Sequence, residues 1–195
     1  PGLAATGDGE LVRCHADLVR QEYLAVGIRI ALSPMADLAV NPRWHRCSGT
    51  FGSHPQRAAE LVRTYVEGMQ HGADGITASS VVSVVKHWVG YGATAPDGYD
   101  AHNHYGRHMA LGSDDIEAHI QPFTGAFAAR VGGVMPAYNV PPQNLYVRGC
   151  EGPVECVAPG FNQQLLQGVL RERFGFDGVV LSDWHITDDC SDICL

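Results

Sequence analysis

Hydrophobic residues recur with helical spacing over residues 9–26, and a short alternating segment follows. The positions that fall near one helical stripe are Leu11, Val12, His15, Leu18, Val19 and Leu24. Asp8 has the side chain of a typical N-cap, and Gly27 suits a helix end. The pattern therefore predicts a helix over 9–26. "IRIALS" (28–33) alternates apolar and polar residues, which favours a strand.

Three further helices follow from the same spacing. The second opens at His54 and Pro55 and runs to Gly72, with proline in the first turn. The third covers 114–131. Asp114 and Glu117 have capping-box spacing there, and Pro122 predicts a kink or a later start. The fourth covers 161–174 and ends at Gly175.

The strands "VVSVVKHW" (81–88), "GGVMPAYN" (132–139) and "DGVVLS" (177–182) each come after a helix. Four helix-then-strand units predict an α/β fold with a parallel sheet under helical cover, either a (β/α) barrel or an open doubly wound sheet. The long segments 34–53, 88–112 and 139–160 follow strands. In such folds the loops beyond the carboxyl ends of the strands carry the chemistry.

Polar residues stand at the carboxyl end of every predicted strand. They are Asp37 with "NPRWHR", Lys86 with His87, Tyr138 with Asn139, and Asp183 with Trp184. One such residue is usually structural, but four in register are harder to dismiss, because a buried charge is costly unless a partner compensates it. A carboxylate can attack an anomeric carbon, cationic groups can bind hydroxyls, and an indole can stack on a sugar ring. The set predicts a sugar site.

Composition narrows the classes of partner. The 195 residues are 45% hydrophobic and carry a formal net charge of -8, so a phosphate backbone would be repelled and nucleic acid is excluded. No run approaches the roughly 18 apolar residues of a membrane span. The first residues lack the pattern of a signal peptide, so we expect a cytosolic chain or one whose leader is missing.

The six cysteines leave two alternatives open. The close pairs Cys150 with Cys156 and Cys190 with Cys194 are loop disulfides of an exported protein, or all six cysteines are free thiols. None has zinc-ribbon spacing. Asp100, His102, His104 and His108 lack a recognised metal spacing and indicate a solvated loop, so no metal or cofactor is predicted.

Four motifs resemble the barrel domain of glycoside hydrolase family 3 β-glucosidases. They are "LSPMADLAVNPRW", "VVKHWVGYG", "GGVMPAYN" and "LLQGVLRERFGFDGVVLSDW". The resemblance implies a partial TIM-like (β/α) barrel in a retaining glycosidase, with Asp183 as nucleophile. It also implies that Arg46, Lys86 and His87 hold sugar hydroxyls and that Tyr138 and Trp184 shape the glucose subsite. His45 stands where the family usually has glycine.

The same resemblance carries expectations about the rest of the protein. It implies that residues 1–195 form a single domain, most of the family's N-terminal barrel without its first strand. The acid/base glutamate would then come from a C-terminal domain outside this chain. Terminal β-glucosides or short β-glucan oligosaccharides are the expected substrates, and the parent protein is expected in the periplasm or outside the cell.

Three alternatives stay open. Asp100-Ala101-His102 has the spacing of the Asp-Ser-His acid/base pair in the family's β-N-acetylglucosaminidase branch, although Val89 to Gly92 replace the PGHG core of that branch. Lys86 at a strand end could instead form a Schiff base, as in an aldolase. The third alternative is a truncated or inactive domain that at most binds sugars.

Overall fold

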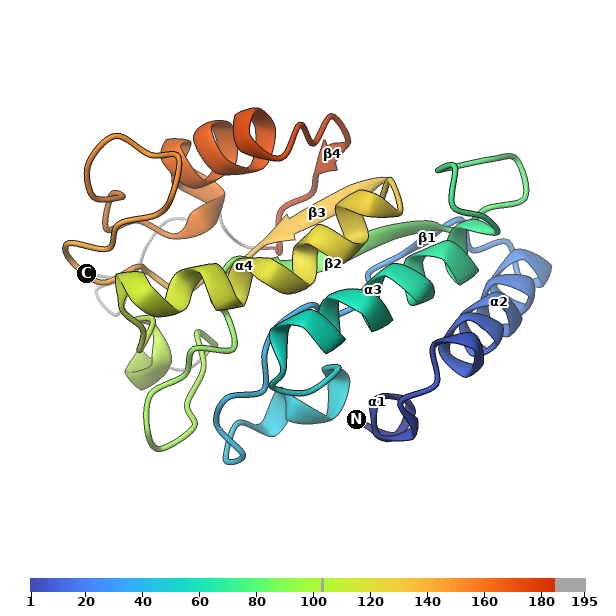
Figure 1. Cartoon of the computed structure of the whole chain (residues 1–195), viewed down its shortest axis with the longest axis horizontal. Helices are drawn as coiled ribbons and strands as arrows, with labels where there is room; N and C mark the ends of the chain where they lie inside the picture. The colour runs from blue at the N-terminus through green and yellow to red at the C-terminus, as the bar shows by residue number, and fades with distance from the viewer. Residues whose placement is uncertain (103, 185–195) are drawn as a thin grey trace.

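The computed structural model describes residues 1–102 and 104–184, and it is an α/β arrangement with one parallel sheet (Figure 1). Three long helices precede or separate the first three strands. In chain order the elements are α1 (Gly2–Thr6), α2 (Gly9–Ala25), β1 (Ile30–Ala31), the 3₁₀-helix His45–Gly49, α3 (Pro55–Gln70), β2 (Val82–Trp88), the 3₁₀-helix His104–Gly106, α4 (Ser113–Ala128), β3 (Gly133–Pro136), the 3₁₀-helix Pro159–Phe161, the π-helix Gln164–Arg173 and β4 (Val179–Val180).

The four strands pair in the order β1-β2-β3-β4, and every pairing is parallel. Ile30 pairs with Val82, and Gly133 lies between Val84 and Val179. All carboxyl ends therefore meet at one edge of the sheet. Within the described residues β1 and β4 form the two outer edges, and the sheet is not closed into a barrel. The predicted parallel α/β fold is confirmed.

Two of the predicted helices have the predicted caps. The carboxylate of Asp8 accepts a hydrogen bond from the backbone N–H of Leu11 at 3.1 Å, so α2 begins at Gly9. The ring of His54 accepts from the N–H of Arg57 at 3.4 Å, ahead of Pro55 in the first turn of α3. No helix in the described ranges combines the length and hydropathy that crossing a bilayer requires.

The capping of α4 differs from the prediction. Asp115, not Glu117, accepts the N–H of the N-cap residue Gly112, at 3.3 Å. Glu117 instead pairs with Arg173 through two short contacts, one of them 2.6 Å, because the guanidinium of the following π-helix reaches it. The helix begins at Ser113 and contains Pro122, so the alternative of a start after Pro122 is wrong.

The strands are shorter than predicted, and the fourth helix is wound differently. Strand β1 has two residues instead of six, and further along the chain the pairing with β2 resumes as a single parallel bridge between Met35 and Lys86. The region 161–174 consists of a 3₁₀ turn and a π-helix, which ends before Gly175 at a φ of 64°. Gly175 is the stop that the sequence predicted.

The core lies between the sheet and the helices α3 and α4, which run side by side across it in Figure 1. Trp88 is fully buried, its ring centroid lies 5.1 Å from that of Phe123, and its Nε1 donates to the carbonyl of Leu165 at 3.1 Å. The two helices approach closely where a Cβ on Gly125 would collide with the carbonyl of Ala59. This packing fixes β2, which carries Lys86 and His87.

The four cysteines within the described residues are free thiols. The first predicted pair is not bridged, since the thiol of Cys150 lies against the carbonyl of Gln164 at 3.8 Å and Cys156 faces solvent. The second predicted pair, Cys190 with Cys194, falls outside the described residues.

Candidate active site

A chain of polar contacts joins three strand ends at the carboxyl edge of the sheet. Asp37, after β1, is buried, and its Oδ2 lies 2.9 Å from Nδ1 of His87 at the end of β2. It also accepts the backbone N–H of His87 at 3.2 Å. On the other side of the ring, Nε2 lies 3.8 Å from Oδ2 of Asp183, which follows β4 after Leu181 and Ser182. Since a carboxylate oxygen accepts, Nδ1 of His87 carries hydrogen and the ring is held in one orientation.

Arg46 reaches the same ring from the long loop after β1. Its Nη2 lies 3.5 Å from Nε2 of His87, and its Nη1 donates to the hydroxyl of Tyr91 at 3.0 Å. The guanidinium also stacks over the Tyr91 ring, 5.1 Å from the centroid. Tyr91 is buried, so its hydroxyl and ring hold Arg46 within the site.

Lys86 is half-buried, and no hydrogen bond or ion pair reaches its ammonium from any described residue. Burial, and then the positive charge of Arg46, lower the pKa of Lys86, while the carboxylates of Asp183 and Asp37 act in the opposite direction. The side chain lines a hollow of about 440 Å³ with Ser33 and other residues. An unpaired ammonium beside two carboxylates can donate hydrogen bonds to a bound hydroxyl group.

Tyr138 and Trp184 lie together at the rim. The hydroxyl of Tyr138 donates to the backbone carbonyl of Trp184 at 2.7 Å, which ties the end of β3 to the residue after Asp183. Burial, and then the nearby carboxylate of Asp183, raise the pKa of Tyr138. The indole of Trp184 is 56% exposed. The indole therefore lies at an open rim of the site and is not enclosed.

The loop after β2 carries Asp100 and His102. This pair is connected to the site through Tyr91. Oδ1 of Asp100 accepts the backbone N–H of His102 at 3.0 Å and lies 3.3 Å from its Nδ1. The hydroxyl of Tyr91 also contacts Nδ1 of His102. The imidazole packs perpendicular to the ring of Tyr138, with the centroids 5.2 Å apart. His102 therefore lies at the rim with its ring wedged between two tyrosines.

The contact with Tyr91 affects which hydrogen bonds His102 can make and whether it can act as an acid. The Tyr91 hydroxyl accepts from Arg46, which leaves its own hydrogen free to point to Nδ1 of His102. Neutral His102 then carries hydrogen on Nε2 and offers a hydrogen bond from there. To act as an acid, it would first have to take a proton on Nδ1 and turn that atom toward Asp100. The arrangement suits a hydrogen-bond donor better than a general acid.

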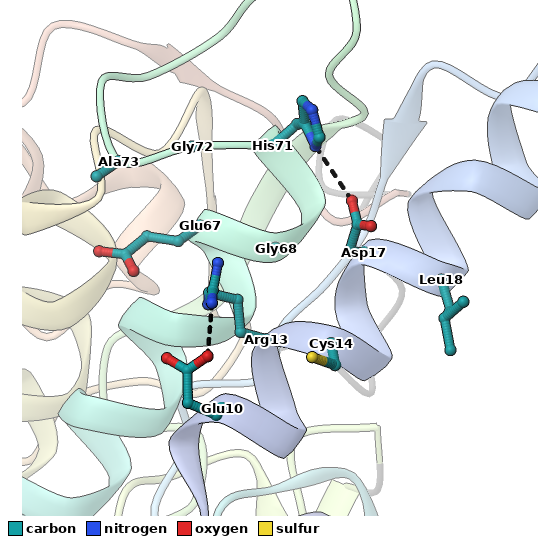
Figure 2. Close-up of a pocket in the computed structure, with 10 residues that line it drawn as sticks. All are labelled: Glu10, Arg13, Cys14, Asp17, Leu18, Glu67, Gly68, His71, Gly72 and Ala73. Carbon is teal, nitrogen blue, oxygen red and sulfur yellow. Dashed lines mark hydrogen bonds and ion pairs between the residues drawn. The ribbon is translucent and has the colours of Figure 1, made fainter.

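A hollow of about 490 Å³ opens between the two loops, and it is lined by Met35, His45, Arg46, Ser48, Gly49 and His102. A larger one, of about 670 Å³, lies between α2 and α3 (Figure 2). Two pairs of its ionisable side chains contact each other, Arg13 with Glu10 at 2.5 Å and His71 with Asp17 at 3.2 Å. The hollow between α2 and α3 contains none of the strand-end residues, whereas Arg46 and His102 line the hollow of about 490 Å³ and Lys86 lines that of about 440 Å³.

No cluster of three or more His, Cys, Asp or Glu side chains that could hold a metal ion occurs within residues 1–102 and 104–184. His108, one of the histidines considered above, contacts Nε of Arg107 at 3.1 Å.

Sequence reasoning did not single out Tyr91 or Trp44 as parts of the site, and it placed Asp37 only at a strand end. Tyr91 is buried between Arg46 and His102, and Nε1 of Trp44 donates to Asp100 at 2.9 Å. An available signal was the replacement of the PGHG core by "VGYG", which puts Tyr91 where the related motif has histidine.

A family model and a curated relative both match nearly the whole chain. The model of the "Glycosyl hydrolase family 3 N terminal domain" matches residues 1–194. A curated "Periplasmic beta-glucosidase/beta-xylosidase" of Dickeya chrysanthemi is 56% identical over 194 residues, which are 100% of this chain and 29% of that protein. The chain thus spans less than a third of the length of this relative.

Solved structures resemble the described fold. A mutant β-glucosidase of Listeria innocua, in complex with laminaribiose, superposes with a TM-score of 0.77 at 29% identity, covering 94% of this chain and 23% of that one. A β-N-acetylglucosaminidase of Paenibacillus gives a TM-score of 0.74 at 27% identity, covering 93% of this chain and 31% of that one.

Proposed function

The chain belongs to glycosyl hydrolase family 3, in the part formed by the N-terminal domain of that family, and on this premise we propose that its protein is a retaining, exo-acting β-glucosidase. The observation that carries the proposal is the separation of 3.8 Å between Nε2 of His87 and Oδ2 of Asp183, at the edge where Arg46 and Lys86 also lie. A carboxylate surrounded by hydrogen-bond donors for hydroxyl groups is what such a reaction requires.

In this mechanism Asp183 is the nucleophile. Its carboxylate attacks the anomeric carbon while an acid protonates the departing oxygen, and water then hydrolyses the glycosyl ester. Arg46, Lys86 and His87 hold hydroxyl groups of the glucosyl ring. Tyr138 keeps the segment after Asp183 in place through the carbonyl of Trp184, whose indole covers a face of the sugar.

For a β-glucosidase we propose that the acid comes from elsewhere in the protein. A retaining enzyme needs a second carboxyl group at about 5 to 5.5 Å from the nucleophile. We propose that this group is a glutamate of a further domain, and that residues 1–195 are most of a barrel that additional strands complete. The open edges support this, since Ile30 on β1 is 57% exposed and Val179 on β4 is 65% exposed.

The proposed substrates are terminal β-D-glucosides and short β-glucan oligosaccharides, without a cofactor. The laminaribiose complex of the Listeria β-glucosidase supports this choice. Because the Dickeya relative is named a periplasmic β-glucosidase/β-xylosidase, β-xylosides should be compared with β-glucosides as substrates. The same name supports a periplasmic location for the parent protein.

A second candidate is a β-N-acetylglucosaminidase that uses Asp100 and His102 as its acid/base pair. The likeness to the Paenibacillus enzyme and the 3.3 Å separation of the two side chains favour it. The hydroxyl of Tyr91 at Nδ1 of His102 speaks against it. Comparing kcat/KM for the glucoside and the N-acetylglucosaminide with the same leaving group separates the two. If neither is hydrolysed, the third alternative of an inactive sugar-binding domain is favoured.

The decisive experiment traps the covalent intermediate. A 2-deoxy-2-fluoroglucoside with a good leaving group is incubated with the full gene product, and the digested protein is analysed by mass spectrometry. We expect one fluoroglucosyl group on Asp183, protection by glucose, and no labelling of an Asp183→Asn variant. Labelling of another carboxylate, or no labelling of an enzyme that turns over glucosides normally, would refute Asp183 as nucleophile.

A further inference from the structure

Asp100 is a buried carboxylate whose two oxygens are both occupied. Oδ2 accepts the indole N–H of Trp44 at 2.9 Å, and Nε2 of His45 lies 3.7 Å from it. Oδ1 accepts the backbone N–H of His102 at 3.0 Å, with Nδ1 of that ring at 3.3 Å. Burial by itself would raise the pKa of Asp100, but the bonds from Trp44 and His102 outweigh it and the pKa is lowered.

These contacts join two loops that are far apart in the sequence. Trp44 and His45 belong to the loop after β1 and directly precede Arg46. His102 belongs to the loop after β2 and contacts the hydroxyl of Tyr91, which accepts from Arg46. Asp100 is therefore connected to the Arg46 guanidinium by two routes, one through the backbone of the first loop and one through His102 and Tyr91.

The loop around Asp100 is folded tightly enough to resist adjustment. A Cβ on Gly106 would collide with the backbone carbonyl of Asp100, so the chain returns directly against that residue. The side chain of Trp44 is 1% exposed, and its ring lies edge-on to that of Tyr91, with the centroids 5.6 Å apart. Without the carboxylate, the indole N–H of Trp44 would stay buried without an acceptor.

We propose that Asp100 is a positioning residue that holds Arg46 and His102 in register for the sugar, and that it is not the acid/base partner of His102. This inference rests on the proposed glycosidase function. Asp100 touches no substrate in this role and acts through Trp44 and His102. It has to be a carboxylate, because the closest group to each of its oxygens, the indole N–H of Trp44 at one and the backbone N–H of His102 at the other, is a donor. An amide would turn its own N–H₂ toward Trp44 or His102.

The kinetic test uses Asp100→Asn in the full gene product, with Asp97→Asn, at an exposed carboxylate of the same loop, as the matched control. Two glucosides are compared, one with a good and one with a poor leaving group. We expect Asp100→Asn to raise KM and lower kcat/KM about tenfold or more, by the same factor for both substrates, while Asp97→Asn behaves as wild type. A loss confined to the poor leaving group, restored by azide, would identify an acid/base role and overturn the proposal.

A double-mutant cycle tests the contact with Trp44. Trp44→Phe removes the indole donor, so Asp100→Asn should cost less in that background than in the wild type. The KM for the glucoside and the Ki of glucose are the readouts, and thermal unfolding verifies that each variant is folded. Additive effects of the two substitutions would overturn the proposal.

A spectroscopic readout separates this inference from the proposed function. The ring ¹⁵N shifts of His102 in the wild type should report hydrogen on Nε2 at neutral pH, and they should change in Asp100→Asn but not in Asp97→Asn. This result is expected even if no glucoside is hydrolysed, in which case the proposed function fails and the positioning contact stands. Unchanged shifts in Asp100→Asn would overturn the positioning role whatever the activity.

Discussion

Nε2 of His87 lies 3.8 Å from Oδ2 of Asp183, although the two residues are 96 positions apart in the chain by their numbers. The parallel sheet brings them together, because β2 and β4 end at the same edge on either side of β3. The buried carboxylate of Asp37, after β1, holds the other side of the His87 ring at 2.9 Å. The separation therefore depends on three strand ends and not on one loop.

Asp37→Asn is expected to lower kcat/KM for a glucoside by about 10- to 100-fold, with little change in the amount of folded protein. Asn offers one carbonyl oxygen where Asp37 now accepts both the ring and the backbone N–H of His87. Steady-state kinetics of the full gene product measure the effect. Asp74→Asn, at an exposed position in the turn after α3, is the control. Equal kinetics of the two variants would show that Asp37 does not orient His87.

Tyr138→Phe is expected to lower kcat/KM by about 2- to 10-fold, because the segment after Asp183 loses the 2.7 Å hydrogen bond to the Trp184 carbonyl. Tyr146→Phe, at a tyrosine that is 54% exposed, should leave the kinetics unchanged. Equal losses in both variants would mean that the hydroxyl of Tyr138 does not support the site.

The grouping of the candidate residues at one edge of the sheet could be predicted from the sequence, while the contacts among them could not. Polar residues after buried strands share an edge in any parallel sheet, so Lys86, His87 and Asp183 could be grouped without coordinates. The bond between Trp44 and Asp100 could not be predicted, because it depends on the conformations of two long loops. No local pattern specifies which donor a buried carboxylate meets across 56 residues.

In the fold, too, local sequence patterns predicted the elements, while contacts between elements far apart in the chain could not be predicted. The spacing of apolar residues and the residues Asp8 and Pro55 located α2 and α3 to within two residues of their ends. The cap of α4 was misjudged because Glu117 had a stronger partner, Arg173, on another helix. Local capping preferences yield to tertiary ion pairs of this kind, which sequence spacing does not reveal.

The ion pair of Glu117 with Arg173 predicts a dependence of stability on pH. The hydrogen bonds from Arg173 are the largest cause of the lowered pKa of Glu117, whose ordinary value is 4.5. A carboxyl group with a lowered pKa stabilises the fold above its ordinary pKa, and this contribution is lost as the pH falls through the folded value. Glu117→Gln should therefore lower the free energy of unfolding by about 1 kcal/mol at pH 7, and by progressively less as the pH falls from the ordinary value of 4.5 through the lowered one.

Thermal unfolding of the full gene product across this pH range measures the difference. Glu155→Gln, at an exposed carboxylate outside the ion pairs among the described residues, is the control and should show no such dependence. A difference between wild type and Glu117→Gln that does not shrink as the pH falls below 4.5 would exclude the ion pair as its cause.

The contact between α3 and α4 predicts opposite effects for two glycine substitutions. In a helix, alanine is favoured over glycine by about 1 kcal/mol, so Gly→Ala should stabilise wherever space allows. At Gly168, in the π-helix, the nearest heavy atom to an added Cβ is the sulfur of Cys150 at 3.9 Å, an ordinary contact. At Gly125 the Cβ would run into the backbone carbonyl of Ala59, which cannot move without shifting α3.

We expect Gly168→Ala to be neutral or stabilising. We expect Gly125→Ala to destabilise the fold by about 1 to 3 kcal/mol, and to lower activity because the two helices pack on β2. Chemical denaturation gives both free energies, and stabilisation by Gly125→Ala would mean that the two helices are not in backbone contact there.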